Sequence, residues 1–134
     1  MIYTSIENEH IKEIKKLNNK KYRDLNGKFI IEGKHLVEEA IKNNLVEEIL
    51  LLEGNNEKYD VKTNYVNGKV MKYITELDNP SKIIGICHKK NDKIQGNHIL
   101  ILDDIQDPGN LGTIIRSAVA FNIDTIILSK TGVD

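Results

Sequence analysis

The residues best suited to chemistry lie in a turn between a predicted strand and a predicted helix, within "ILDDIQDPGNLGTIIRSAVAF" (residues 101–121). This turn holds Asp103, Asp104 and Asp107, and Pro108 follows at once. A helix N-terminus offers free N–H groups and the positive end of a dipole, so it suits a phosphate or another anion. Three aspartates would repel an anion, and the turn therefore needs another explanation.

General nucleotide- and RNA-binding motifs match this turn poorly. Gly109 and Gly112 fit neither the dinucleotide-binding pattern G-x-G-x-x-G nor the P-loop pattern G-x-x-x-x-G-K-[ST]. The tetrapeptide "GNLG" matches the GxxG loop of KH domains. That loop normally joins two helices, whereas a predicted buried strand precedes it here, and two fixed glycines are a weak pattern.

A longer pattern is specific. "LDDIQDPGNLGTIIRSA" closely resembles the first signature motif of the SpoU family of RNA ribose 2′-O-methyltransferases, the trefoil-knot methyltransferases. "KKYRDLNGKFIIEGKHLVEEAI" resembles the small ribosomal-protein-like substrate-binding domain of that family, and "NPSKIIGICHK" resembles its closing strand. The resemblance implies an enzyme that transfers a methyl group from S-adenosylmethionine to a ribose 2′-hydroxyl of RNA, with ribosomal RNA favoured over transfer RNA.

The resemblance implies that Asn110 and Arg116 serve the catalytic site, and that the residues binding S-adenosylmethionine lie beyond Asp134. It also implies a homodimer for the parent protein. Arginine occurs twice in the chain and lysine 17 times, so position 116 needs a planar fork that can hold a phosphate bidentately. Arginine side chains stay protonated at neutral pH, which favours orientation over proton abstraction. From the residues alone, Arg116 could be a solvated helix residue and Asn110 a helix N-cap.

A basic segment provides the candidate RNA-binding residues. Seven positive side chains and two acids lie between Lys12 and Lys28. The resemblance and this charge indicate RNA binding by the cluster Lys20, Lys21, Tyr22 and Arg23, because basic and aromatic side chains together hold phosphates and stack bases. The alternative is a tyrosine packed on a sheet beside solvated lysines.

The periodicity of apolar residues predicts an α/β fold for residues 1–94, in the order helix, strand, helix, strand, strand, helix, strand. We expect strands at 28–32, 46–52, 64–66 and 81–89, and helices at 34–44 and 69–77. The first helix is expected to start at a capping box of Thr4 and Glu7, with an apolar stripe of Ile11, Ile14 and Leu17. In the second helix Leu36, Val37, Ala40 and Ile41 should face inward. This small α/β sandwich would be the RNA substrate-binding domain.

Residues 95–134 read as a second region, after a polar linker at 91–97. Two apolar strands flank a helix whose core side should present Leu111, Ile114, Ile115, Ala118 and Val119, which predicts a parallel β-α-β unit. Charge also differs: residues 1–94 carry 17 Lys/Arg and 15 Asp/Glu, whereas 95–134 carry 2 and 5. We interpret 95–134 as the start of a knotted SpoU methyltransferase domain, and expect the 134-residue chain alone to be inactive and unable to bind the methyl donor.

Composition argues against a disulfide-bonded, a membrane-spanning or a metal-binding protein. The single cysteine, Cys87, rules out an internal disulfide and suits a small buried hydrophobe in a reducing compartment. No apolar run reaches the roughly 20 residues of a membrane span, and a cytoplasmic location is expected. The four histidines show no metal-ligand spacing, so no metal is expected. The competing function is an RNA-binding module without catalytic activity.

Overall fold

A computed structural model describes all residues, 1–134. The chain forms two compact units, Met1–Lys90 (unit 1) and Asn91–Asp134 (unit 2), and each is described by itself. The domain boundary predicted after residue 94 lies four residues further along the chain than the boundary between these units. None of the helices is long and apolar enough to cross a membrane.

Unit 1 contains one mixed five-stranded sheet. Strand β3 is central and pairs with β4 in parallel and with β5 antiparallel. Strand β1 extends the sheet in parallel beyond β4, and β2 extends it antiparallel beyond β5. The order across the sheet is β1 (Ile2–Tyr3), β4 (Thr63–Val66), β3 (Val46–Leu52), β5 (Ile83–His88) and β2 (Lys28–Glu32).

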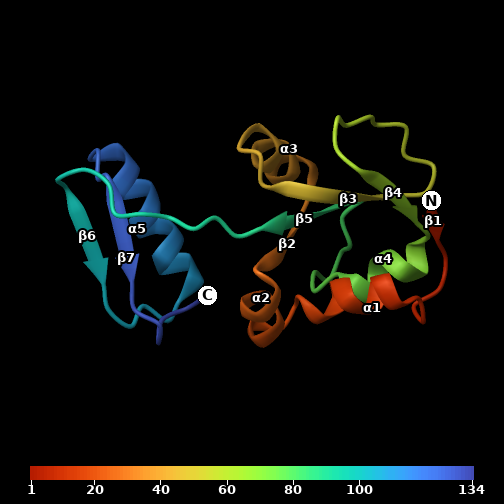
Figure 1. Cartoon of the computed structure of the whole chain (residues 1–134), viewed down its shortest axis with the longest axis horizontal. Coiled ribbons are helices and arrows are strands. Elements are labelled where there is room, and N and C mark those ends of the chain that lie inside the picture. Colours follow the sequence, from red (N-terminus) through yellow and green to blue (C-terminus); the bar gives the residue numbers. More distant parts are fainter. The chain divides into compact units, whose positions relative to one another are not determined.

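Helices cover both faces of this sheet. Helices α1 (Glu9–Lys16) and α4 (Gly68–Ile74) lie on one face, and α3 (Lys34–Lys42) lies on the other (Figure 1). A short helix, α2 (Lys20–Asn26), joins α1 to β2. Because both faces are covered, central strand β3 is apolar at successive positions rather than alternating, as in Ile49–Leu52.

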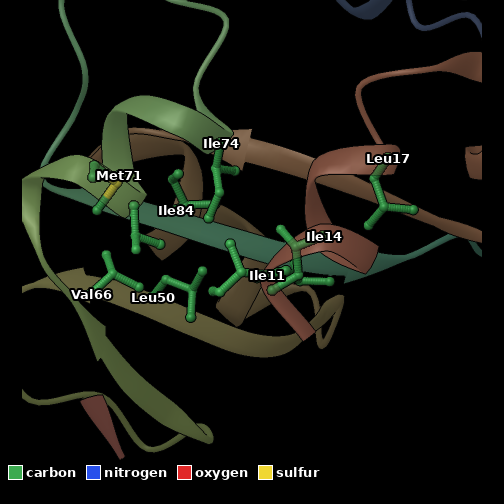
Figure 2. Packing of buried hydrophobic residues seen from close by; sticks show 10 residues of the cluster. Ile11, Ile14, Leu17, Leu50, Val66, Met71, Ile74 and Ile84 are labelled. Carbon is green, nitrogen blue, oxygen red and sulfur yellow. The ribbon is translucent and has the colours of Figure 1, made fainter. Parts of the chain in front are cut away.

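The larger core lies between α1, α4 and the sheet. The stripe of α1 is fully buried, as predicted, and it packs against α4 and the strands below it (Figure 2). The buried side chains of this cluster are Ile11, Ile14, Leu17, Leu50, Val66, Val70, Met71, Ile74, Ile84 and Ile86. This packing fixes the position of α1, which carries Lys12, Lys15 and Lys16 of the basic segment.

The second core lies under α3 and includes Val37, Ile49, Leu51 and Ile83. A Cβ atom at Gly85 would lie 3.0 Å from Cγ1 of Ile31 and 3.3 Å from Cγ2 of Val37, so a glycine allows α3 to pack closely on β5. Cys87 is fully buried, which confirms its predicted role as a small hydrophobe. Burial raises the pKa of its thiol to about 11, so the thiol stays protonated at neutral pH.

The strands at 28–32 and 46–52 are confirmed at the predicted bounds, and the other predicted elements of unit 1 are confirmed with small differences at their ends. Two expectations about single residues were wrong, and two short elements were not predicted. The side chain of Asn8, rather than Thr4, caps α1, because its carboxamide oxygen accepts from the backbone N–H groups of His10 and Ile11. Leu36 is 54% exposed, because α3 buries the stripe through Val37 and Ala40. Helix α2 and strand β1 were missed, since both are too short to show a period.

Unit 2 is a β-α-β unit, as predicted. Strands β6 (Ile99–Leu102) and β7 (Thr125–Leu128) pair in parallel, and α5 (Pro108–Ala120) connects them. Of the five residues expected on the core side of α5, Ala118 is buried, while Ile115 and Val119 are 41% and 71% exposed. The prediction for those two was wrong because a two-stranded sheet is too narrow to cover the whole apolar stripe.

The amino ends of β6 and β7 are joined by Asp124. One oxygen of its carboxylate accepts from the backbone N–H groups of Asn97 and His98, both at 3.0 Å. These hydrogen bonds hold the pKa of the Asp124 carboxyl below its usual value. The acidic side chain therefore has a local structural role at this end of unit 2.

The core under α1 generates a stability prediction. We expect Leu50→Ala, which removes a fully buried side chain, to lower the free energy of unfolding by about 2–5 kcal/mol. Leu25→Ala is the matched control, because Leu25 is 73% exposed and its truncation should change that free energy by no more than about 0.5 kcal/mol. Urea denaturation followed by circular dichroism measures both. Equal decreases in the two variants would contradict the assigned core.

Candidate functional site

The acidic turn connects β6 to α5 in unit 2. Asp107 caps the helix: its Oδ2 accepts from the backbone N–H of Asn110 at 3.0 Å, and Pro108 occupies the first helical position. Proline there costs nothing, because its missing N–H would have no partner inside the helix. The alternative role of Asn110 as N-cap is therefore wrong, and its side chain is left for another use.

Hydrogen bonds join the loop after β6 to the loop after β7. The backbone N–H of Asp104 donates to Oγ of Ser129 at 2.8 Å, and Nε2 of Gln106 donates to the carbonyl oxygen of Thr131 at 2.7 Å. The backbone N–H of Val133 donates to the carbonyl oxygen of Ile105 at 2.7 Å. The carboxyl ends of the two parallel strands thus form one connected surface, the edge at which open α/β sheets bind ligands.

The aspartates of the turn stabilise it locally. Oδ1 of Asp104 accepts from Nε2 of Gln106 at 2.5 Å, and the Asp104 backbone has a left-handed φ of 56°. The partner of Asp104 is thus an amide of the same loop rather than a basic group elsewhere in the site. Asp104 and Asp107 accept hydrogen bonds from the backbone and side chains of the turn itself. Their negative charges are therefore explained by the local fold and not by a bound ligand.

A shallow hollow of about 510 Å³ lies beside this turn, lined by residues 104–107 and by the first turns of α5. Asn110, Thr113 and Ile114 line it from the helix, whereas Arg116 does not. Arg116 is exposed on α5 and makes no ion pair. The two predicted catalytic residues are six positions apart on the helix, which corresponds to about 9 Å along the axis and about 120° around it. They therefore lie on adjoining faces of one helix.

The predicted RNA-binding cluster lies on α2 of unit 1. Tyr22 is half-buried, and Nζ of Lys16 and of Lys21 each lie 5.7 Å from the centre of its ring. Ammonium groups at this distance are attracted to the face of the ring. Lys20 lies within 3.4 Å of Asp24. Tyr22 and the three lysines thus form a basic-aromatic surface.

Arg23 has a structural role that the sequence did not indicate. Its Nη1 donates to the carbonyl oxygens of Leu17 and Asn18, at 3.1 and 2.9 Å, just after α1 ends. The side chain of Asn18 in turn donates to the carbonyl oxygen of Ile74 at the end of α4. Arg23 therefore fixes α2 against the end of α1, and its removal would disturb the fold of this segment as well as its charge.

The basic segment is less positive than its composition suggests. Lys12 pairs with Glu7 at 2.6 Å, Lys16 with Glu13 at 2.6 Å, and Lys28 with Glu47 at 2.6 Å. Lys15 and Lys21 have no carboxylate partner and lie instead over Tyr73 and Tyr22. The sum of charges along residues 12–28 could not show this pairing, because Glu47 lies outside that segment.

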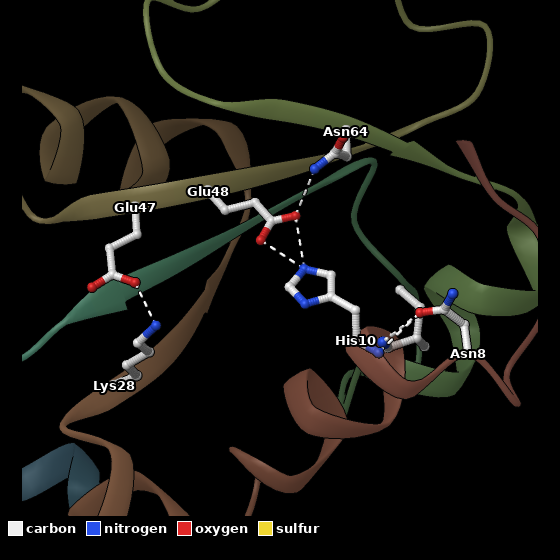
Figure 3. Close-up of polar contacts among 7 residues, drawn as sticks. Asn8, His10, Lys28, Glu47, Glu48 and Asn64 are labelled. Carbon is white, nitrogen blue, oxygen red and sulfur yellow. Dashed lines mark hydrogen bonds and ion pairs between the residues drawn. The ribbon is translucent and has the colours of Figure 1, made fainter. Parts of the chain in front are cut away.

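One polar cluster was missed entirely. Glu48 is 5% exposed, and its carboxylate lies 2.8 and 3.0 Å from Nε2 of His10 (Figure 3). Nδ2 of Asn64 donates to the same carboxylate at 2.8 Å. Its burial could have been predicted from its position in the strand. Glu48 is two residues from Leu50 on β3 and therefore faces the same helix-covered side. No group of three or more His, Cys, Asp or Glu side chains could hold a metal ion.

Comparison with known proteins agrees with these features. Residues 8–85 match the MRM3-like substrate binding domain, and residues 97–134 match the SpoU rRNA Methylase family. The 23S rRNA (guanosine(2553)-2′-O)-methyltransferase RlmP of Bacillus subtilis is 37% identical, over 97% of this chain and 55% of that protein. The human protein named rRNA methyltransferase 3, mitochondrial, is 29% identical over 88% of this chain and 32% of its own length.

Solved structures are similar too. The AdoMet-bound rRNA methyltransferase from Sinorhizobium meliloti has a TM-score of 0.81 and 32% identity, covering all of this chain and 56% of that one. The chain thus spans about half the length of these bacterial relatives. The substrate-binding match covers more than half of the chain, and the methylase match covers the turn described above. The chain belongs to the SpoU family of RNA 2′-O-methyltransferases.

Proposed function

We propose that this protein acts in the S-adenosylmethionine-dependent methylation of a ribose 2′-hydroxyl of ribosomal RNA. Unit 1 binds the RNA, and unit 2 contributes Asn110 and Arg116 to the catalytic site. The observation that carries the proposal is the surface at the carboxyl ends of β6 and β7, where Asn110 lines the hollow. Neither the Asn110 side chain nor that of Arg116, further along α5, has a role in the local fold. Family membership and the names of the relatives support the same activity.

The reaction would join the 2′-oxygen of the ribose to the methyl carbon while the carbon–sulfur bond of the sulfonium donor breaks. S-adenosylhomocysteine and the hydroxyl proton would be released. A ribose hydroxyl is a poor nucleophile, so it must be oriented and its developing charge stabilised. The exposed guanidinium of Arg116 suits a bidentate bond to an RNA phosphate beside that ribose. Because Asp107 caps α5, the carboxamide of Asn110 can donate a hydrogen bond to the hydroxyl or accept one from it.

S-adenosylmethionine supplies the methyl group when bound. Ligand pockets usually bury most of their ligand, yet the hollow at Asn110 is shallow and most of its lining side chains are exposed. Gln106, which could otherwise offer an amide, is bonded to Asp104 and Thr131. The described residues thus do not by themselves fit this donor, and no residue of the chain is assigned to its binding.

We propose ribosomal RNA rather than transfer RNA as the substrate because of the names of the relatives and the match to a substrate-binding domain. A homodimer and a cytoplasmic location are further parts of the proposal. The human relative is named as a mitochondrial protein.

RNA binding by unit 1 can be tested through the surface of α2. We expect the double variant Lys20→Gln, Lys21→Gln to bind structured RNA severalfold more weakly and to lower the slope of log affinity against log salt, by roughly 0.7–0.9 for each phosphate that is no longer bound. Arg23 is left unchanged because it stabilises the end of α1. The matched control is Lys34→Gln, Lys42→Gln on α3, which removes the same charge from the opposite side of the sheet. Equal weakening by both pairs would remove α2 as the RNA site.

Arg116 can be tested in an active enzyme that carries this chain. Arg116→Lys retains the charge but lacks the planar fork, so kcat should fall by about tenfold or more with little change in melting temperature. Ser117→Ala, at the next exposed position of α5, is the control and should leave kcat unchanged. Methyl transfer to RNA is measured under single-turnover conditions. A Lys variant with the original rate would show that Arg116 is only a helix-surface residue.

The open hollow generates a third prediction. Calorimetric titration of residues 1–134 with S-adenosylmethionine should give no binding heat, because the lining around Asn110 does not enclose a ligand. The Sinorhizobium meliloti protein, whose structure is AdoMet-bound, is the positive control. Stoichiometric binding at micromolar concentration by residues 1–134 would refute this view of the hollow.

A further inference from the structure

A second cavity lies in unit 1, on the α1 side of the sheet. It has a volume of about 300 Å³, and its floor is formed by Ile14, Leu17 and Ile86, all buried core residues. Polar groups surround this apolar floor, among them the carboxylates of Glu47 and Glu48. An apolar floor with a few convergent polar groups is the usual composition of a site for a small organic ligand.

The two carboxylates reach the same cavity because β3 is irregular at this point. Val46 pairs with Cys87 and Glu48 pairs with Ile86, so two steps on β3 oppose one step on β5 and Glu47 is the extra residue of a β-bulge. In a regular strand, neighbouring side chains would point to opposite faces. Bulges that redirect a side chain are over-represented next to functional sites. Figure 3 shows Glu47 extending toward Lys28 and Glu48 toward His10.

The Glu48 carboxylate is held rigidly and keeps one acceptor position. Because a carboxylate oxygen accepts, Nε2 of His10 donates to both oxygens, and Nδ2 of Asn64 donates to Oε1. Each carboxylate oxygen has two acceptor positions. Oε1 uses both, whereas Oε2 uses one, for His10 at 2.8 Å. The cavity thus contains a buried, oriented acceptor that an N–H donor of a ligand can complete.

The rim of the cavity continues into the RNA-binding surface proposed above. Asn26, the last residue of α2, lines the cavity, as does Lys28 at the start of β2. Lys28 is paired with Glu47, whereas Lys62 is exposed and makes no ion pair. An RNA strand bound along α2 would therefore pass the mouth of the cavity, with Lys62 available to its phosphates.

We propose that this cavity takes one unstacked RNA base that carries an exocyclic amino group, which donates to Glu48. The inference rests on the proposed function of unit 1 as an RNA-binding domain, and it names how that domain selects a nucleotide. Sequence-specific RNA recognition targets bases splayed out of single strands and reads the polar edges of those bases. A carboxylate accepts from base amino groups, and the floor of Ile14, Leu17 and Ile86 contacts the apolar face of the ring.

Other ligand classes fit less well. A phosphate would meet three of the carboxylates that line the cavity, Glu13, Glu47 and Glu48. An entirely apolar ligand would cover the open acceptor of Glu48 without pairing it. Uracil has no exocyclic amino group, so the proposal predicts discrimination among bases. The experiment uses that difference.

The test uses the 134-residue chain and four fluorescent eight-nucleotide RNAs: U8, and the same sequence with its fifth base replaced by guanine, cytosine or adenine. At least one amino-bearing base should raise the affinity over U8 by about tenfold, as one charge-assisted hydrogen bond would. In the Glu48→Gln variant this gain should vanish while the affinity for U8 stays the same. Glu39→Gln on α3, at the opposite face of the sheet, is the control and should keep the gain.

Amide chemical shifts of the wild-type chain give a second readout that needs no variant. The favoured RNA, compared with U8, should shift the amides of Glu48 and Ile86. If U8 binds but no base is preferred and these amides stay in place, or if Glu48→Gln keeps the gain, the cavity is not a base site and the RNA-binding proposal stands. If none of the four RNAs binds, the RNA-binding proposal itself fails, and this inference fails with it.

Discussion

The burial of one apolar stripe, formed by Ile11 and Ile14 of α1 and by Leu17 at its C-cap, against the central sheet positions the polar groups of unit 1 described above. It brings His10 to the carboxylate of Glu48 at the other side of the contact. It also fixes where α1 ends, and Arg23 donates to the carbonyl oxygens exposed there. Helix α2 and its lysines are thus held in place by a hydrophobic contact in which they take no part.

Most of the charged side chains in the basic segment of unit 1 form ion pairs within the protein. Many of the lysines that make residues 12–28 look basic are neutralised by carboxylates, some of them distant in sequence, such as Glu47 for Lys28. Exposed ion pairs of this kind contribute little to stability, because solvent screens them.

Unit 2 separates structural from chemical residues within one short motif. Asp104 and Asp107 satisfy the backbone and amide donors of the turn, and Pro108 starts the helix. Asn110 and Arg116 take no part through their side chains in these bonds and stay accessible on α5. A turn with three acids next to a helix N-terminus is thereby consistent with RNA chemistry, because at least two of the acids bind the turn itself and the arginine lies beyond it.

The sequence by itself determined the fold class, the principal strands and helices, the parallel β-α-β unit and the family, because these depend on local periodicity and on one contiguous motif. Tertiary structure decided the rest. The exposure of Leu36, Ile115 and Val119 depends on how much sheet surface each helix has to cover, which a helical period does not state. The role of Arg23 depends on where α1 ends, and the cavity at Glu48 on residues up to 38 positions away from it and on a bulge in β3. Such contacts follow from the packing of whole elements, so no local pattern could have predicted them.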